Sequence, residues 1–197
     1  MQINANKKEE EVWDLESALD VLIVLLYSEG PKGKVGEAIE GITRLDKIMY
    51  LLSKTKEFSP IVNQSYNFQA DNFGPFAPEL FDDIQVLKHE GVIRASEKEA
   101  KNKIQTIDEE SVEKIFDEAK NMSISWKQYS IERYELTELG TKIGIALFKG
   151  LSESQKETIK TVKKKFGEMN LKNLLYYVYS KYPKMTANSI IREKILQ

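Results

Sequence analysis

The chain has 197 residues, of which 41% are hydrophobic and 30% charged, enough for the core of one domain or of one domain with an appendage. It contains no cysteine and only one histidine, which excludes disulfides and thiolate chemistry and nearly excludes a His-rich metal site or a Ser-His-Asp relay. The first residues lack the apolar core of a signal peptide. The longest apolar run, Val21 to Tyr27, is far shorter than the ~20 residues that span a bilayer. We therefore expect a cytoplasmic protein with no membrane contact.

The net charge of −2 conceals a division along the chain. Residues 151–197 carry 10 Lys and Arg against 4 Asp and Glu, about +6, whereas residues 1–150 carry 19 against 27, about −8. Such an asymmetry indicates either an acidic body with a basic attachment surface or two parts that attract each other within the fold.

Residues 1–11 are polar and without periodicity, so we expect a disordered tail. Structure begins near Trp13, and the nearly all-apolar run from Ala18 to Tyr27 predicts a central helix buried on several sides. The glycine-rich segment 28–41 lacks the pattern of a phosphate-binding P-loop and is interpreted as a connector.

A second helix is predicted to open at a capping box formed by Thr43 and Asp46. Its apolar positions share one face, which places Arg44 and Lys47 on the outer face. The following segment, 58–65, reads as a loop held by Pro60.

The stretch from Asn67 to Ile93 organises the rest of the chain. Alternation over 67–71 predicts a half-buried strand, and the residues 73–76, Phe-Gly-Pro-Phe, break any regular pattern. A helix is predicted from about Pro78 to Glu90, followed by a left-handed Gly91 and a new extended segment. A helix, a glycine and a short strand in this order are typical of the third helix and wing of a winged helix-turn-helix, in which that helix reads DNA.

The outer face of this helix is unsuited to DNA. The helix carries four acids against one lysine, about −3, and each carboxylate would repel a phosphate backbone. We therefore predict that this face meets a protein partner, and the candidate partner-binding residues are Glu79, Asp82, Asp83, Val86 and His89.

A long connecting segment follows Ile93. It contains a charged insert, 96–122, with a short helix over about 108–121, and then an aromatic and β-branched stretch, 123–136, that reads as one or two strands. Pairing of that stretch with Val92-Ile93 would form the wing. A further helix, capped by Thr137, is predicted to run to Phe148.

Two helices are predicted near the C-terminus. The first, capped by Ser152 and Gln155, is amphipathic and basic and could lie on phosphates, on an anionic membrane surface or on the acidic third helix, although solvated lysines over a packed face are the commoner case. The second, from Leu171 to Tyr182, carries a tyrosine stripe that packs in a core more often than it stacks on nucleobases. The candidate nucleic-acid-binding residues are Arg44, Lys47, Lys156, Lys160, Lys163 and Lys164.

Four segments, 42–52, 66–93, 134–140 and 181–190, resemble the YwgA-like and Panacea (SocA-like antitoxin) proteins. Among these segments, the Phe-Gly-Pro turn before an acidic-faced helix supports the resemblance most strongly. The resemblance implies a helical, winged-helix-related fold without an active site, and for the Panacea group it implies neutralisation of a toxin by protein contact.

No catalytic constellation stands out, and we expect neither an enzyme nor a cofactor or metal site. Glu99-Ala-Lys101 and Glu118-Ala-Lys120 resemble half of a nuclease motif, but such triplets arise by chance in a chain this charged. Asp82 and His89 could contribute to a metal or acid–base cluster, yet their spacing along a helix separates them by about 10 Å.

The expected fold is mainly α with a small β-sheet: a winged helix-turn-helix-like core over 12–150, with basic helices of 151–197 packed on it. Two functions stay open. The first is a protein-binding module of antitoxin or regulatory type that uses the third helix. The second is a transcriptional regulator that contacts DNA through the basic residues above. A homodimer is compatible with either.

Overall fold

The computed structural model describes residues 11–97 and 132–197. The predicted insert helix, the larger part of the predicted stretch 123–136 and both Glu-x-Lys triplets lie outside the described residues.

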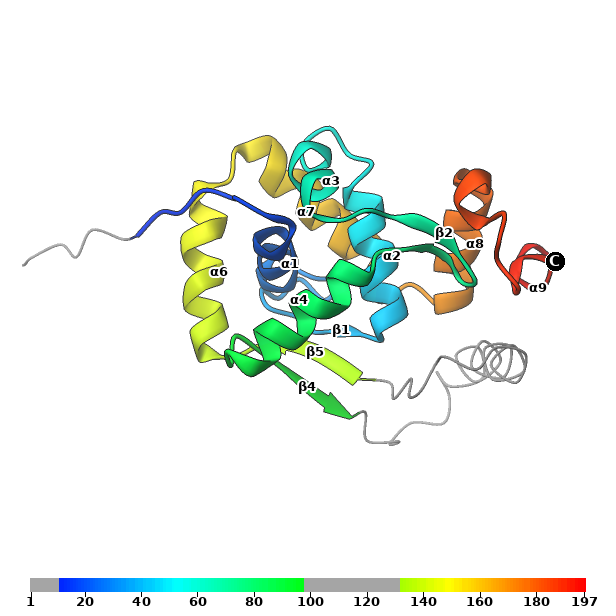
Figure 1. Ribbon diagram of the computed structural model, residues 1–197. Helices are drawn as coiled ribbons and strands as arrows, with labels where there is room; N and C mark the ends of the chain where they lie inside the picture. The colour runs from blue at the N-terminus through cyan, green and yellow to red at the C-terminus, as the bar shows by residue number, and fades with distance from the viewer. Residues whose placement is uncertain (1–10, 98–131) are drawn as a thin grey trace, which may run out of the picture.

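Within the described residues the chain is mainly helical with two small antiparallel sheets (Figure 1). The helices are α1 (Ala18–Tyr27), α2 (Ile42–Leu52), α3 (Ser59–Ser65), α4 (Pro78–His89), α6 (Glu138–Gly150), α7 (Glu153–Phe166), α8 (Leu171–Lys181), the 3-10 turn η1 (Pro183–Thr186) and α9 (Arg192–Leu196). The strands are β1 (Ile39–Glu40), β2 (Gln69–Asp71), β3 (Gly74–Phe76), β4 (Ile93–Glu97) and β5 (Glu132–Leu136).

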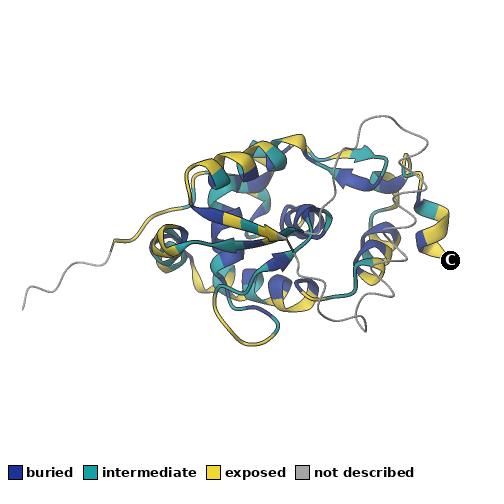
Figure 2. Ribbon diagram, turned by 90° about the horizontal axis from the view of Figure 1, so that it is seen from below, coloured by how far each residue is buried: buried dark blue, intermediate teal, exposed yellow. Residues whose placement is uncertain are grey.

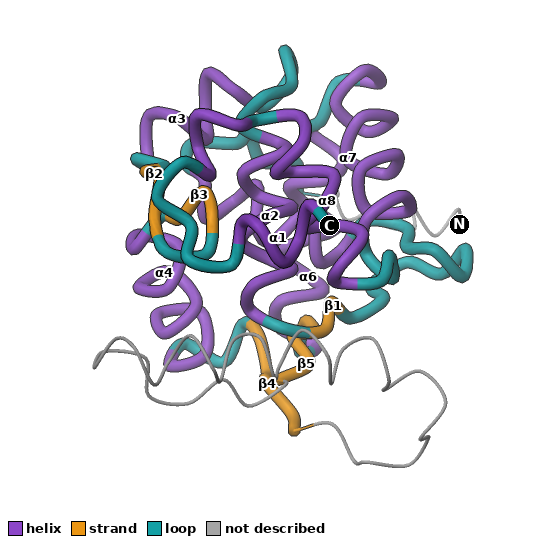
Figure 3. Tube along the Cα trace, turned by 90° about the vertical axis from the view of Figure 1, so that its right-hand side faces the viewer, coloured by secondary structure: helices purple, strands orange, loops and turns teal. Residues whose placement is uncertain are grey.

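Helix α1 lies at the centre, between α3, α6, α7 and β5 (Figures 1 and 3). Its residues from Val21 to Leu26 are all buried, which confirms the predicted central helix. The helix begins at Ala18 rather than near Trp13, because Ser17 and Asp20 form a capping box that starts it there. The surrounding helices turn one face inward and the other to solvent, as the burial colours show (Figure 2).

The larger sheet has the strand order β1-β5-β4. Strand β4 pairs antiparallel with β5, and Ile93 stands opposite Leu136, which confirms the predicted pairing for residues 132–136. Gly91 has a φ of 67°, as predicted for the residue that ends α4. Thr137 caps α6 by accepting from the Gly140 N–H at 3.1 Å, as predicted.

Two predictions about the segment before the hairpin are wrong. Residues 59–65 form α3 rather than a loop, because Pro60 lies in the first turn, where a missing N–H needs no partner. Helix α2 begins at Ile42, directly after Gly41, and lacks the capping box of Thr43 and Asp46. The Asp46 side chain instead turns inward to Lys47 and to the backbone of Ala77.

Strands β2 and β3 form a hairpin directly before α4, with Gln69 opposite Phe76. Strand β2 confirms the predicted strand for residues 69–71, whereas residues 67 and 68 lie before it. The turn falls at Asn72 and Phe73, so that Gly74, with a φ of 89°, already belongs to the returning strand. Helix α4 therefore begins directly after a short hairpin.

The C-terminal helices follow their predicted bounds closely. Ser152 and Gln155 form the predicted capping box of α7, and α8 ends before Pro183. Helix α7 packs against α1 and α2, and α8 packs against α2. Among the described residues, no helix combines the length and the apolar character that a membrane crossing would need.

Candidate protein-docking site on helix α4

The outer face of α4 carries most of the predicted partner-binding residues. Asp82 and His89 are exposed, and the Val86 side chain between them is 50% exposed. Glu79 and Asp83 are half-buried on the flank of the helix. The structure thus brings three of the five predicted residues together on one solvent face and places two beside it. Leu80, Ile84 and Leu87 bury the opposite face.

The flank of α4 holds an acidic cluster around the buried Tyr66. The Tyr66 hydroxyl donates to the Asp83 carboxylate at 2.7 Å. Burial raises the pKa of Asp83, the bond from Tyr66 opposes that rise, and the charges of Asp82, Glu79 and Asp20 add to it. Burial and the neighbouring carboxylates raise the pKa of Tyr66 as well. The described residues place no cation within ion-pair distance of Asp82 or Asp83. The cluster therefore keeps an uncompensated negative field.

Asp83→Asn is expected to stabilise the fold at pH 7 by up to about 1 kcal/mol. The amide of the variant would still accept from Tyr66 but would carry no charge beside Asp82 and Glu79. Because the folded-state pKa of Asp83 is raised, its contribution to stability is lost as pH rises through that pKa. Urea unfolding at pH 4 and pH 7 checks this: the advantage of the variant should appear at pH 7 and shrink at pH 4. A variant that is less stable than the parent at both pH values would contradict this account of the cluster.

The predicted position of Arg44 and Lys47 on the outer face of the second helix is wrong. Both side chains are almost fully buried, at 4% and 2% exposure. Arg44 donates to the backbone carbonyls of Glu40, Phe166 and Met169, which ties α2 to the end of α7. Carbonyl groups at a helix end lack intrahelical partners, and a guanidinium satisfies several at once. Neither side chain is available to a phosphate backbone.

The predicted position of Lys163 on a solvent face of α7 is also wrong. Its side chain is fully buried, and its ammonium donates to the carbonyls of Leu26 and Ser28 at 2.7 and 2.8 Å. These carbonyls end α1, whose last turn has no basic residue of its own. Burial lowers the pKa of Lys163 to about 7. Lys163 caps the central helix rather than meeting a ligand.

The other three predicted nucleic-acid-binding lysines also have partners within the chain. Lys156 pairs with Glu153 at 2.9 Å, and Lys164 pairs with Glu29 at 2.6 Å. Lys160 lies 5.9 Å from the centre of the Phe148 ring. Of these three contacts, only the pair of Lys164 with Glu29 joins a lysine of residues 151–197 to an acid of residues 1–150.

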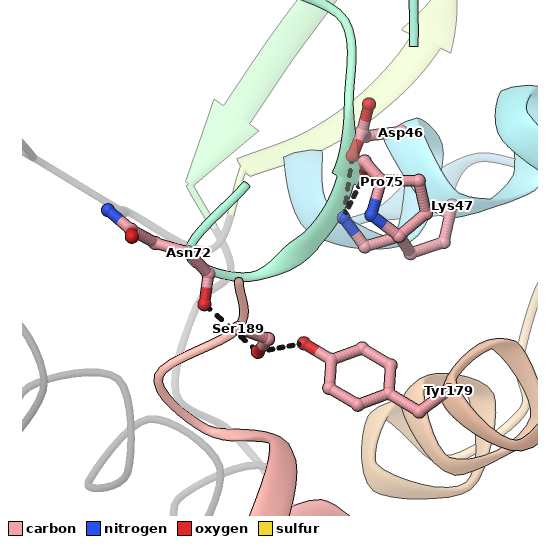
Figure 4. A network of polar contacts seen from close by, with 6 residues as sticks. All are labelled: Asp46, Lys47, Asn72, Pro75, Tyr179 and Ser189. Carbon is pink, nitrogen blue, oxygen red and sulfur yellow. Dashed lines mark hydrogen bonds and ion pairs between the residues drawn. The ribbon is translucent and has the colours of Figure 1, made fainter. Parts of the chain in front are cut away.

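A polar network fixes the hairpin that carries α4 (Figure 4). The Lys47 ammonium donates to the Asp46 carboxylate and to the Pro75 carbonyl, both at 2.7 Å. On the other side of the hairpin, Ser189 donates to the Asn72 carbonyl at 3.0 Å and shares a hydrogen bond with the Tyr179 hydroxyl at 2.8 Å. Gly74 leaves room for this arrangement, since a Cβ there would lie 2.9 Å from the Tyr179 ring.

No local sequence pattern predicts this support for α4. Ser189 lies more than a hundred residues from the hairpin, and a hydroxyl in a polar tail carries no periodic signal. Asp46 and Lys47 are neighbours in sequence, and neighbouring residues on a helix ordinarily point to different faces. The Lys47 side chain turns inward because it donates to two buried acceptors, the Asp46 carboxylate and the Pro75 carbonyl.

The described residues contain no group of three or more His, Asp or Glu side chains that could hold a metal ion. Within the described ranges, the one polar partner of the His89 ring is the Glu90 carboxylate, at 3.0 Å. The site therefore consists of carboxylates, one imidazole and an exposed valine on a rigid helix, a set of groups suited to recognising a surface.

A family model described as "Antitoxin SocA-like, Panacea domain" matches residues 45–184. That range runs from α2 to η1 and includes α4 with its hairpin. The comparisons with curated proteins and with solved structures gave no match. Because the family model covers well over half of the chain and confirms the resemblance in the sequence, this chain belongs to the SocA-like antitoxin family of Panacea-domain proteins.

Proposed function

We propose that this chain is a non-enzymatic, antitoxin-type protein that binds a partner protein through the outer face of α4. The observation that carries the proposal is the combination, on one helix, of the exposed Asp82, the half-exposed Val86 and the exposed His89. An apolar side chain bordered by charges is the composition of a small protein interface. Membership of an antitoxin family supports a toxin as the partner.

The charge of the face supports a partner with a basic surface. Acidic side chains steer a positively charged protein towards them and repel nucleic acid. The uncompensated carboxylates on α4 and its flank extend this field beyond the contact itself. We expect complementary lysines or arginines on the partner.

The scaffold that we propose is of the winged-helix type. Support comes from the order of the elements: a central helix, β1, helix α2, helix α4 and then the paired β4 and β5, with β1 next to β5 in the sheet. Helix α3 and the β2–β3 hairpin are inserted between α2 and α4. Helix α4 takes the position of a DNA-reading helix, but its acidic face and the burial of Arg44, Lys47 and Lys163 disfavour the regulator that contacts DNA through these residues. The division into 12–150 and 151–197 and a homodimer stay predictions.

The double variant Asp82→Lys, Val86→Asp is expected to lose the partner, because it reverses one charge and places a carboxylate where an apolar contact is buried. The partner to be tested is the protein encoded by the neighbouring gene, purified separately. Its dissociation constant should increase at least about 100-fold, corresponding to about 2.7 kcal/mol. Nuclease treatment of both proteins should leave the parent complex intact.

A matched control keeps the test specific. Glu157→Lys with Val35→Asp makes the same two kinds of change, with the same net change in charge of +1, at exposed residues of α7 and of the segment 28–41, and should change the affinity less than about threefold. Equal loss in both double variants, or unchanged affinity in the α4 variant, would show that α4 is not the docking site.

A further inference from the structure

A second surface, formed by the end of α2 and by α7 and α8, carries lysines that contact aromatic rings. The Lys54 ammonium lies 4.7 Å from the centre of the Tyr50 ring. Lys165 lies 4.9 Å from the centre of the Tyr177 ring. Lys181 lies 5.4 Å from Tyr177 and 5.5 Å from Tyr182. Each ammonium group is within the range of a cation–π contact.

These contacts join into one row. The rings of Tyr50 and Tyr182 are in edge-to-face contact at 5.1 Å between centres, and Phe166 lies 5.1 Å from Tyr177. Cations and rings therefore lie side by side from the end of α2, across α8, to the end of α7. Tyr50 and Phe166 are buried and hold the row in place, whereas Tyr177 and Tyr182 are half-buried and the lysines are exposed.

The lysines of this row differ from those of the basic helix face. Among the described residues, Lys54, Lys165 and Lys181 have no carboxylate within ion-pair distance, whereas Lys156 and Lys164 do. The Tyr177 hydroxyl accepts from Lys181 at 3.1 Å and raises the pKa of that lysine, so it stays cationic at neutral pH. The positive charge here is available to a ligand.

A more exposed tyrosine lies beside this row. Tyr176 precedes Tyr177 on α8, about 100° further round the helix, and is 52% exposed. We call the set Lys54, Lys165, Lys181, Tyr176, Tyr177 and Tyr182 the lysine–tyrosine surface. Rings beside cations match a ligand that has flat bases beside anionic phosphates.

We propose that the lysine–tyrosine surface binds single-stranded nucleic acid, with phosphates along the lysines and a base stacked on Tyr176. In a duplex the bases stack on one another and are not offered to a tyrosine. An acidic peptide would match the lysines but would leave the exposed ring without a flat partner. The site lies on helices other than α4.

Fluorescence anisotropy of a labelled 20-nucleotide oligothymidine with the full chain tests the proposal. Tyr176→Leu should weaken binding by about 5- to 100-fold, the effect of losing one stacked base. Lys165→Glu with Lys181→Glu should weaken it at least as much, and should lower the slope of log affinity against log salt by about 0.7 for each phosphate that is no longer neutralised. A duplex of the same length should bind more weakly than the single strand.

The control is Lys156→Glu with Lys164→Glu, which makes the same charge change on α7 at lysines that already pair with Glu153 and Glu29. It should retain most of the affinity, and circular dichroism should show all variants folded. Three results would overturn the proposal: no binding of the oligonucleotide by the parent chain, an equal loss in the control, or equal displacement by polyglutamate, which would identify an acidic protein as the ligand.

Discussion

Lys47→Met is expected to destabilise the fold by about 3–5 kcal/mol, the range for removing one partner of a buried ion pair. The Lys47 ammonium is the cation bonded to the Asp46 carboxylate, and it also satisfies the Pro75 carbonyl. Asp46 is almost fully buried, and one of its oxygens already lacks a hydrogen bond. Without Lys47, a carboxylate and a carbonyl would both be buried and unsatisfied. Chemical unfolding at pH 7 measures the loss.

A double variant separates the effect of an unpaired buried charge from the effect of lost packing. Asp46→Asn added to Lys47→Met removes the buried carboxylate yet keeps an acceptor for the Ala77 backbone. The double variant should recover at least about 1 kcal/mol relative to Lys47→Met alone, a coupling typical of contacting residues. Lys54→Met, at an exposed lysine just beyond α2, serves as the control and should stay within about 0.5 kcal/mol of the parent. A cost below about 1 kcal/mol for Lys47→Met would mean that the pair does not anchor the hairpin.

The pH dependence of the same variant has a defined sign. Burial already raises the pKa of Asp46 in the parent protein, despite Lys47. Loss of the lysine raises the folded-state pKa further, so the folded Lys47→Met variant holds a proton that the unfolded chain releases. Its stability should therefore fall as pH rises from 4 to 7, more steeply than that of the parent.

Lys163→Met is expected to be the next most damaging change, at about 2–3 kcal/mol, because it removes the ammonium donor from two buried carbonyl groups, of which only that of Ser28 has a second donor, the Gly36 N–H at 3.4 Å. The carbonyls of Leu26 and Ser28 end the central helix, and Lys163 reaches them from α7. The exposed Lys172→Met on α8 provides the comparison and should cost less than about 0.5 kcal/mol.

The buried lysine also gives the parent protein a distinctive pH profile. The folded-state pKa of Lys163 is lowered to about 7, below its unfolded value. The contribution of this group to stability is complete above the unfolded pKa and is lost as pH falls through the folded one. Between pH 7 and pH 9, the parent should gain stability relative to Lys163→Met by up to about 1.4 kcal/mol per pH unit. Parallel profiles for the two proteins would show that Lys163 does not titrate in this way.

Periodic and capping signals in the sequence predict the elements around the docking site. The apolar stripe of α4, Gly91 after it and the Thr137 cap of α6 are local, and the structure confirms them. The central helix α1 is equally clear, since almost every side chain in it is apolar.

Prediction fails where a charged side chain finds a partner from a distant part of the chain. The sequence pattern assigns Arg44, Lys47 and Lys163 to solvent because lysine and arginine rarely lie in a core. Each is buried because helix ends and a hairpin offer backbone carbonyls to which its side chain donates. Spacing along one helix cannot reveal carbonyls contributed by another element.

The sequence of α4 alone predicts its acidic face, whereas the pKa of Asp83 on that helix depends on residues from other elements. Tyr66 holds Asp83 at the flank, and Asp20 of α1 adds to the negative charge around it. The hairpin that aims the helix is fixed by Ser189 and Lys47 from opposite sides. These contacts join segments that are far apart in sequence, so no local sequence pattern predicts them.

A partner protein that covers the outer face of α4 should shield a probe placed there. The absence of cysteine from the chain allows single cysteines to report contact at chosen positions without background. Val86→Cys lies at the centre of the proposed site, and Glu157→Cys on α7 lies away from it.

The decisive measurement is the rate of maleimide labelling of these two cysteines with and without the product of the neighbouring gene. We predict that a saturating partner slows labelling at position 86 at least about tenfold, because burial excludes the reagent, while position 157 labels at its free rate. Unchanged labelling at position 86 in a complex that demonstrably forms would contradict the account.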